Sequence, residues 1–517
     1  MRRIVISVAF GFALTVLLWA PHGAAQQAAG SPRAVPPPLA YVESSSGLGN
    51  PAWEGGHTEL EMGDVNGDGL ADIVTIGDHG SPYVGTNEHG IMVYFGNGTG
   101  AGWSVYMNGN FGYGGIALGD VNDDGLADVG YGMHHANSST DFGNQLIEVA
   151  LGDGTGRNWT PWDDGLATHG ESWGMFGTDF ADVDGDGDLD LVSISFGAGA
   201  GLHVYLNDGD GTWTHSFGFL NGNSSLVVCF GDVNGDGWPD IAAGHEYGTV
   251  WLGDGLGGFV NADGSLPSSS LGLLGVDLDD VNGDGFQDIS LCTIGGSIQV
   301  WLWNGSNDWV SFSDGLPGSS TYQYTQLSDL DGDGSVDLAA FADRTVKVWM
   351  LDETQTWQAV TSFQTGSPGY PQAFRSGVDV DYNGRADIVL LSDEGSWPSD
   401  HNYLRFYREA SVPTQPAIRF VYPRGNEVLR RGAVVFVDWI STVPGGFGGA
   451  SRVRLELSTS GRGGPWIPLA LDLANGGRYQ WRIPGGLPAS SECLLRLRMT
   501  SPAGAAWAVT PQPFRLQ

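Results

Sequence analysis

The hydrophobic positions of this chain fall in short runs of four to eight residues, and they do not follow helical spacing. The runs DIVTIG (72–77), DLVSIS (190–195) and DIVLLS (387–392) are typical examples. They are rich in β-branched residues and are bounded by Gly, Asn and Asp, which is the pattern of strands separated by tight turns. The sequence therefore predicts an all-β protein.

A nine-residue segment organises these runs into repeats. DVNGDGLAD begins at residue 64, and related segments begin at residues 120, 182, 232, 280, 329 and 379. A short run precedes each copy, and a second, apolar run follows it. A third run ends in turn residues. A fourth run begins near an aromatic residue, usually Trp. Four strands in about 50 residues make one propeller blade, so the seven copies predict a seven-bladed β-propeller over residues 39–409.

The last copy lacks a fourth run, because its third run is followed directly by the linker ASVPTQP (410–416). At the other end of the repeats, LAYVESSSGLG (39–49) resembles the fourth runs found elsewhere. We therefore predict that residues 39–45 supply the missing strand of the last blade, which would cover the edges of an open ring.

The nine-residue segments concentrate negative charge. Positions 1, 3, 5 and 9 of every copy are Asp or Asn, and position 6 is always Gly. Two carboxylates about 4 Å apart repel by roughly 4 kcal/mol at an effective dielectric near 20, so such clusters need a counter-ion. Oxygen ligands without His or Cys favour Ca²⁺ over zinc. An alternative is that the Asp and Asn residues only cap tight hairpins through Asx-turns. The loops are not EF-hands, because position 12 lies inside a strand-like run and is never Glu.

These loops resemble the FG-GAP or VCBS-type repeats of integrin-α-like β-propellers, over residues 39–412. The resemblance implies up to seven Ca²⁺ ions, one in each hairpin between the first and second strands of a blade. The ligands would be the side chains at positions 1, 3, 5 and 9 and the carbonyl at position 7. In chain order these positions are Asp64, Asn66, Asp68, Leu70 and Asp72; Asp120, Asn122, Asp124, Leu126 and Asp128; Asp182, Asp184, Asp186, Asp188 and Asp190; Asp232, Asn234, Asp236, Trp238 and Asp240; Asp280, Asn282, Asp284, Phe286 and Asp288; Asp329, Asp331, Asp333, Ser335 and Asp337; Asp379, Asp381, Asn383, Arg385 and Asp387. The last copy departs most from the pattern, with Tyr382 at position 4 and Asn383 at position 5.

Histidine and aromatic residues gather in the loops that would lie on the opposite face of the ring. The long loops there belong to the first, second and last blades, which become neighbours when the ring closes. This predicts a shared ligand-binding patch, for which the candidate residues are His134, His135, Trp173, Trp397 and His401. The alternative is that these are tolerant surface loops whose aromatic residues pack locally.

Residues 417–517 show about seven alternating runs punctuated by Gly and Pro, which favours an immunoglobulin-like (Ig-like) β-sandwich. This segment resembles cell-surface sandwich modules through Pro423-Arg424-Gly425-Asn426, Trp439, Leu457-Ser458, Trp481-Arg482-Ile483-Pro484 and Cys493. Three arginine pairs at even spacing each share one sheet face: Arg452/Arg454, Arg478/Arg482 and Arg496/Arg498. These faces are either solvated or dock onto an anionic surface, which could be a glycan or the acidic propeller itself.

The charge distribution supports two separate parts. The formal net charge of the 517 residues is −37, yet residues 413–517 carry twelve arginines and five acidic residues. The acidic body makes nucleic acid an unsuitable partner. The three cysteines do not form a disulfide framework.

The N-terminus has the pattern of a secretion signal, with Arg2 and Arg3 before an apolar run. We predict a signal peptide over 1–25 and a linker over 26–38; an uncleaved membrane anchor is the alternative. The sequence thus predicts a monomer without a membrane span after cleavage. It would be secreted to an extracellular, cell-surface or periplasmic location.

No GxSxG elbow, HExxH motif or phosphate loop is present in the sequence. We therefore predict a calcium-binding propeller that acts without catalysis in binding or adhesion to an extracellular glycan or protein. The alternatives are a carbohydrate-active enzyme similar to polysaccharide lyases and a lectin on the same scaffold. Lys347 is the only lysine, so the propeller has few cations with which to hold an anionic sugar.

Overall fold

A computed structural model describes residues 39–49, 58–77, 90–106, 114–136, 144–171, 174–195, 201–219, 226–244, 248–269, 271–366, 369–394 and 401–517. Within these ranges the regular structure consists of strands and one short 3-10 helix, Gly448–Ala450. None of the helices in these ranges is long and apolar enough to cross a membrane. The protein is therefore all-β, as the sequence predicted. The predicted signal peptide lies outside the described residues.

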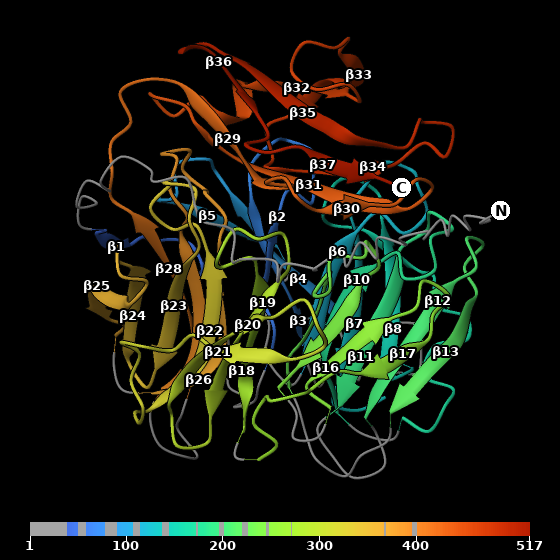
Figure 1. Cartoon of the computed structure of the whole chain (residues 1–517). Coiled ribbons are helices and arrows are strands. Elements are labelled where there is room, and N and C mark those ends of the chain that lie inside the picture. The colour runs from blue at the N-terminus through green and yellow to red at the C-terminus, as the bar shows by residue number, and fades with distance from the viewer. Residues whose placement is uncertain are drawn as a thin grey trace, which may run out of the picture. The chain divides into compact units, whose positions relative to one another are not determined.

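Seven four-stranded antiparallel sheets form between residues 41 and 409 of the described chain, and their colours run from blue to orange in Figure 1. The first three sheets are β2 (Glu61–Gly63), β3 (Asp72–Gly77), β4 (Gly90–Gly96) and β5 (Trp103–Tyr106); β6 (Gly114–Gly119), β7 (Asp128–Met133), β8 (Ile147–Gly152) and β9 (Trp159–Pro161); β10 (Met175–Ala181), β11 (Asp190–Ser195), β12 (Leu202–Asn207) and β13 (Trp213–Phe219). The next three are β14 (Val228–Gly231), β15 (Asp240–Ala243), β16 (Val250–Gly253) and β17 (Phe259–Asn261); β18 (Leu271–Asp279), β19 (Asp288–Thr293), β20 (Ile298–Trp303) and β21 (Trp309–Ser311); β22 (Tyr322–Ser328), β23 (Asp337–Ala342), β24 (Thr345–Leu351) and β25 (Trp357–Gln364).

The seventh sheet joins the two ends of this region. It contains β26 (Gly369–Ser376), β27 (Ile388–Glu394), β28 (His401–Glu409) and β1 (Tyr41–Glu43). Tyr41 pairs with Glu409 and Glu43 with Tyr407, so the N-terminal strand supplies the fourth position, as the sequence predicted.

The second strand of each sheet is the most buried. All six residues of β3, β7 and β11 are buried, which explains their continuous apolar runs. The fourth strands are more exposed, as in β25, because they lie at the edge of their sheet.

A tryptophan at the start of the fourth strand links neighbouring sheets. The indole Nε1 of Trp357 donates to the carbonyl of Phe312, which directly follows β21 of the preceding sheet, at 2.8 Å. Trp309 and Trp213 make the same bond to Ala262 and Trp162. Trp103 donates to Ser44, which follows β1, so β1 takes the place of a fourth strand in this respect too.

The first strands lie side by side in chain order, from β2 through β6, β10, β14, β18 and β22 to β26. Arg375 of β26 donates to the carbonyl of Leu60, next to β2, at 2.9 Å. The last sheet therefore also contacts the first.

Residues 417–517 form two further sheets around their own core. The first contains β29 (Ala417–Tyr422), β31 (Val434–Thr442) and β34 (Arg478–Arg482). The second contains β30 (Val428–Leu429), β37 (Phe514–Leu516), β35 (Ser490–Ser501), β32 (Arg452–Ser458) and β33 (Ile467–Ala474), and β36 (Gly504–Val509) pairs with β35. Trp439, Trp481 and Cys493 lie in the buried core between them. The sequence pattern had indicated about seven strands; the short β30 and the separate β37 raise this number to nine.

Candidate metal centre

Each nine-residue segment forms the turn between the first and second strands of a sheet. The first segment, 64–72, joins β2 to β3, and the other six occupy the equivalent positions. The glycine at position 6 has a positive φ in every copy, between 83° at Gly69 and 98° at Gly187. A residue with a Cβ atom is strained in that conformation, so the invariant glycine has a local structural cause.

The side-chain oxygens of the loop turn inward and accept backbone N–H groups. The position-1 carboxylate accepts the N–H of position 6 at 2.7–3.1 Å in all seven copies. Position 3 accepts the N–H of position 5 at 2.8–3.2 Å. Position 5 accepts the N–H of position 7 at 2.8–3.0 Å. These are the Asx-turn bonds that the sequence left open as an alternative. A carboxylate or amide oxygen has two lone pairs, so these oxygens can accept a further partner, except Asp182 Oδ2, which accepts N–H groups from both Gly187 and Val434.

The aspartate at position 9 is the most buried part of the loop. All seven of these residues are at most 1% exposed. Each accepts the N–H of position 2, at 2.8–3.3 Å. In six copies the other oxygen accepts the N–H of the last residue of the third strand, for example Gly253 to Asp240 at 2.8 Å. Position 9 therefore anchors the loop to the sheet.

The backbone N–H groups that bond to the loop aspartates carry no net charge, so the negative charge of the carboxylates is not neutralised by them. Burial and, after it, the negative charge of the neighbouring loop aspartates raise the pKa of Asp72 to about 8 and that of Asp128 to about 7, against the lowering effect of the backbone hydrogen bonds. Burial also raises the pKa of Asp232 to about 7, with Asp236 as the next cause. A divalent cation among these oxygens would keep the carboxylates ionised and offset their repulsion.

Three loops bring carboxylate oxygens within 4.8 Å of one another. They are Asp182, Asp184 and Asp190; Asp329, Asp331 and Asp333; and Asp379, Asp381 and Asp387. The donors are hard oxygen atoms, which fit Ca²⁺.

The seventh loop differs, as its sequence suggested. Arg408 lies 3.3 Å from Asp381 and supplies a cation of its own. Tyr382 has a positive φ of 59°, is buried, and donates its hydroxyl to the carbonyl of Gly69 in the first loop.

The C-terminal sheets contact all seven aspartate loops. The backbone N–H of Val434 donates to Asp182 at 2.8 Å, and Gln480 exchanges two hydrogen bonds with the backbone of Asp120. Four arginines reach the loops or the strand ends beside them: Arg419 to Asp329, Arg424 to Asp279, Arg430 to the carbonyl of Asp236, and Arg482 to Asp123 and the carbonyl of Asp186. The remaining contacts involve the first, fifth and seventh loops: Gly476 beside Asp64, Asn426 with Gly283, and Val443 with Tyr382.

The arginine pairs therefore separate into two groups. Arg482 docks onto the acidic loops, whereas Arg454, Arg496 and Arg498 converge on the buried Glu456 of their own module, at 2.6–3.1 Å. The sequence left two interpretations open for these faces, a solvated face or docking onto an anionic surface. Arg482 docks, and its anionic surface is that of the acidic repeats.

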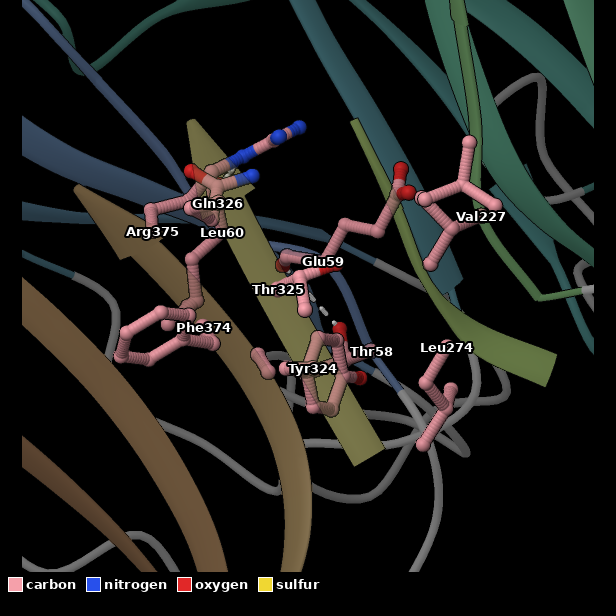
Figure 2. Close-up of a pocket in the computed structure, with 12 residues that line it drawn as sticks. Thr58, Glu59, Leu60, Val227, Leu274, Tyr324, Thr325, Gln326, Phe374 and Arg375 are labelled. Carbon is pink, nitrogen blue, oxygen red and sulfur yellow. Dashed lines mark hydrogen bonds between the residues drawn. The ribbon is translucent and has the colours of Figure 1, made fainter. Parts of the chain in front are cut away.

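A small cavity lies between the first strands. Figure 2 shows Glu59 extending towards Val227 inside it. The Glu59 Oε2 atom accepts the N–H of Ile116 at 3.2 Å and of Thr178 at 3.1 Å, while Oε1 has no hydrogen-bond partner among the described residues. The cavity volume is about 10 Å³, which is room for one water molecule and excludes an organic ligand.

The predicted ligand patch is only partly within the described chain. Trp173 and Trp397 lie outside the described residues. The rings of His134 and His135 lie 3.7 Å apart, centroid to centroid, and both residues are half-buried. His401 is the first residue of β28. The patch remains a prediction.

Sequence reasoning passed over two other histidines, His203 and His215, which the fold brings together with Glu171. The signal available was His203-x-Tyr205, which places both side chains on one face of a strand.

The comparisons with known proteins support the repeats. The FG-GAP-like repeat family matches residues 182–243 and 329–390, so the chain contains FG-GAP-like repeats. The comparison with curated proteins finds no match.

Solved structures resemble the chain at low identity. The crystal structure of BBS1N in complex with ARL6DN, soaked with mercury, is 10% identical, with a TM-score of 0.44 over 72% of this chain and 97% of that chain. The crystal structure of Saccharomyces cerevisiae Sqt1 is 12% identical, with a TM-score of 0.41 over 72% and 99%. The lead-soaked form of the first complex is 9% identical, with a TM-score of 0.40 over 71% and 98%.

Proposed function

We propose that the protein is a secreted, calcium-binding β-propeller of seven blades, followed by an Ig-like β-sandwich, that binds an extracellular glycan or protein without catalysis. The observation that carries this proposal is the recurrence of one loop geometry, with its inward oxygens and its glycine of positive φ, in all seven four-stranded sheets. A structural turn alone would not require three or four carboxyl groups in every copy, because Ser, Thr or Asn can form the same turn.

In this proposal the loop residues have two separate tasks. Positions 1, 3 and 5 and the position-7 carbonyl hold the ion, and position 9 fixes the loop to its sheet while lending its remaining lone pairs. The ion supplies the positive charge that lets the aspartates stay ionised together. The third and sixth loops, which have aspartate at all four of positions 1, 3, 5 and 9, would bind most tightly, and the seventh, with Arg408 and Tyr382, most weakly.

The calcium proposal is tested by thermal unfolding with a chelator and with added calcium. A ligand that binds only the folded state adds about 2.7 kcal/mol per site at 100-fold excess over its dissociation constant, so several sites would raise the melting temperature strongly. Elemental analysis of the purified protein should find several equivalents of calcium. An unchanged melting temperature together with a calcium-free protein would contradict the proposal.

The binding proposal is tested by a glycan and cell-surface screen, run with and without calcium, together with polysaccharide lyase assays. Calcium-dependent binding without turnover supports a binding or adhesion protein, whereas cleavage of an acidic polysaccharide supports the enzyme alternative. For secretion, N-terminal sequencing of the exported protein should begin at Gln26, which follows the predicted cleavage site after Ala25.

A further inference from the structure

The larger sheet of the C-terminal module has a cationic outer face. Leu455 of β32 and Leu497 of β35 lie in the buried core of the module. Successive side chains of a strand point to opposite faces of the sheet, so Arg454, Arg496 and Arg498 lie on the outer face. The sequence left open whether such a face is only solvated or binds an anionic surface.

An exposed tryptophan extends this face. Trp507 of β36 lies directly opposite Arg498 in the sheet register, and Arg498 lies directly opposite Arg454. Directly opposite residues share one face of a sheet, so the indole and the two guanidinium groups form a row across three strands. Trp507 is 68% exposed, and the side chains of Arg498 and Arg454 are 52% and 44% exposed. The row is therefore accessible to a ligand.

One carboxylate serves all three arginines of the face. Glu456 lies 3.0 Å from Arg454, 2.6 Å from Arg496 and 3.1 Å from Arg498. Three guanidinium groups and one carboxylate leave two positive charges in excess. Like charges directly opposite each other, as in Arg454 and Arg498, destabilise a sheet. An anion above the row would offset this cost, so the face is complementary to one or two acid groups.

The contacts with the aspartate loops do not use this face. The ion pairs of Arg454, Arg496 and Arg498 in the described chain lie within the module. Arg496 also lies over the ring of Trp466, with 4.1 Å between its Cζ atom and the ring centroid, and its side chain is 16% exposed. Arg496 therefore supports the face, and the two more exposed arginines are the ones that a ligand contacts.

The geometry favours a chain molecule that carries widely spaced acid groups. Neighbouring strands are about 4.8 Å apart, so a ligand that contacts Trp507, Arg498 and Arg454 together spans about 10 Å. Guanidinium groups pair with flat or tetrahedral oxyanions through two hydrogen bonds. The exposed indole offers an apolar surface on which the C–H face of a sugar ring packs. Nucleic acid carries one charge per about 1.7 Å of duplex, so the acidic body of the protein repels it more strongly than a sparsely charged sugar chain.

We propose that this face binds an acidic polysaccharide. Its sulfate or carboxylate groups pair with Arg454 and Arg498, and one of its sugar rings stacks on Trp507. We call these three residues the arginine–tryptophan row. The inference rests on the proposed function, because it names the class of glycan and the surface that binds it. The row lies outside the aspartate loops, so no bound calcium contributes to it.

The test is isothermal titration calorimetry of the full chain in saturating calcium with three polymers of equal length. The polymers are lightly substituted dextran sulfate, carboxymethyl dextran and neutral dextran, which share one backbone and differ only in the acid group. We expect the acidic dextrans to bind at least about 10-fold more tightly than neutral dextran, because charged hydrogen bonds are lost with the acid groups. The tighter of the two acidic dextrans identifies sulfate or carboxylate as the preferred group. Single-stranded DNA is the fourth titrant.

Substitutions in the row should weaken binding of the preferred dextran. Arg454→Gln and Arg498→Gln should each weaken it about 10-fold, and the double variant about 100-fold, because each removes charge-assisted hydrogen bonds. Trp507→Ala should weaken it about 10-fold, whereas Trp507→Phe keeps an aromatic ring and most of the affinity. All three positions are exposed enough for the variants to fold. Arg344→Gln, which removes an exposed arginine between β23 and β24, is the matched control and should bind like the parent.

Two results would overturn the proposal while leaving the proposed function intact: equal binding of neutral and acidic dextrans, or equal affinity of the double arginine variant and the parent. In either case the glycan and cell-surface screen can still find a ligand on another surface. Tighter binding of single-stranded DNA through the same two arginines would assign the face to nucleic acid instead. A parent chain that binds no glycan and no cell surface in the screen would contradict the proposed function itself.

Discussion

At the scale of single residues, the aspartates of one loop are not equivalent. The side chains at positions 1, 3 and 5 bond to their own loop and range from exposed to buried, whereas position 9 is buried in every copy and joins the loop to the third strand in six of them. The sequence identifies every aspartate of the loop as a candidate ligand. Only the fold shows that the aspartate at position 9 also stabilises the hairpin through its hydrogen bonds.

Replacing a position-9 aspartate should therefore destabilise the protein even without calcium. Asp240→Ala leaves the N–H groups of Val233 and Gly253 without their acceptor, and each buried unsatisfied donor costs about 1–3 kcal/mol. We expect a loss of at least about 2 kcal/mol in the free energy of unfolding, measured by urea denaturation in chelator. The control Asp254→Ala removes an acceptor on an exposed hairpin, where water replaces it. Equal stability of Asp240→Ala and the parent in chelator would contradict this role.

A second residue-scale prediction concerns pH. Asp277, on β18, accepts the N–H of Leu327 on β22 at 2.7 Å, and burial raises its pKa to about 7. Its pKa in the unfolded chain is about 3.9, so the folded state binds the proton more tightly and stability falls as pH rises from about 4 to about 7. Asp277→Asn cannot ionise and keeps an acceptor, so its stability at pH 8 should exceed that of the parent by as much as about 4 kcal/mol, the free energy that corresponds to a shift of about three pKa units. Urea denaturation at several pH values, in saturating calcium, measures this. The exposed Asp314→Asn variant should follow the parent curve, and a parallel curve for Asp277→Asn would refute the assignment.

At the scale of elements, the tryptophan that begins the fourth strand in four of the described sheets fixes that sheet to the one before it. Trp357 is 1% exposed and bonds to Phe312 in the preceding sheet. Trp357→Ala should lower the free energy of unfolding by about 3–5 kcal/mol, and Trp357→Phe by less, since it retains most of the buried area. Trp507 on β36 is 68% exposed, so Trp507→Phe should have no measurable effect. If both tryptophan positions responded alike in chemical denaturation, the proposed link between sheets would be wrong.

The strands were largely predictable from the sequence. The contacts that were missed all join residues that are distant in the sequence. Periodicity and turn residues predicted the four strands of each repeat and assigned residues 39–45 to the last sheet, where the strand spans Tyr41–Glu43, because those signals are local or repeat along the chain. The meeting of His203, His215 and Glu171 was not predictable from local signals. His203 and His215 meet only through the pairing of β12 with β13, and Glu171 reaches them from a segment that precedes β10.

At the scale of the whole molecule, the C-terminal module and the acidic repeats form a charged interface. Arg424 meets Asp279, Arg419 meets Asp329 and Arg482 meets Asp123, so the excess of arginine after residue 413 faces the excess of aspartate before it. The sequence showed both excesses and left open what the arginines face. The sequence could not identify the partner of Arg482. Arg496 and Arg498 are also an even number of residues apart, yet both form ion pairs with Glu456 of their own module.

This interface predicts that the two parts stay together when the chain between them is cut. A protease site placed at the exposed Val412 would open the linker 410–416, and both pieces should still co-elute in low salt. Charge reversal at Arg424 and Arg482 places glutamates against Asp279 and Asp123, so the two pieces of the cleaved variant should separate on size exclusion. High salt screens the ion pairs, so it should promote separation of the cleaved parent. Reversal at Arg454 and Arg498, which face Glu456, is the matched control and should leave the pieces associated. Separation of the cleaved parent in low salt would show that the linker alone holds the module in place. Association that survives the Arg424 and Arg482 reversal would instead assign the docking to the uncharged contacts, such as that of Val434 with Asp182.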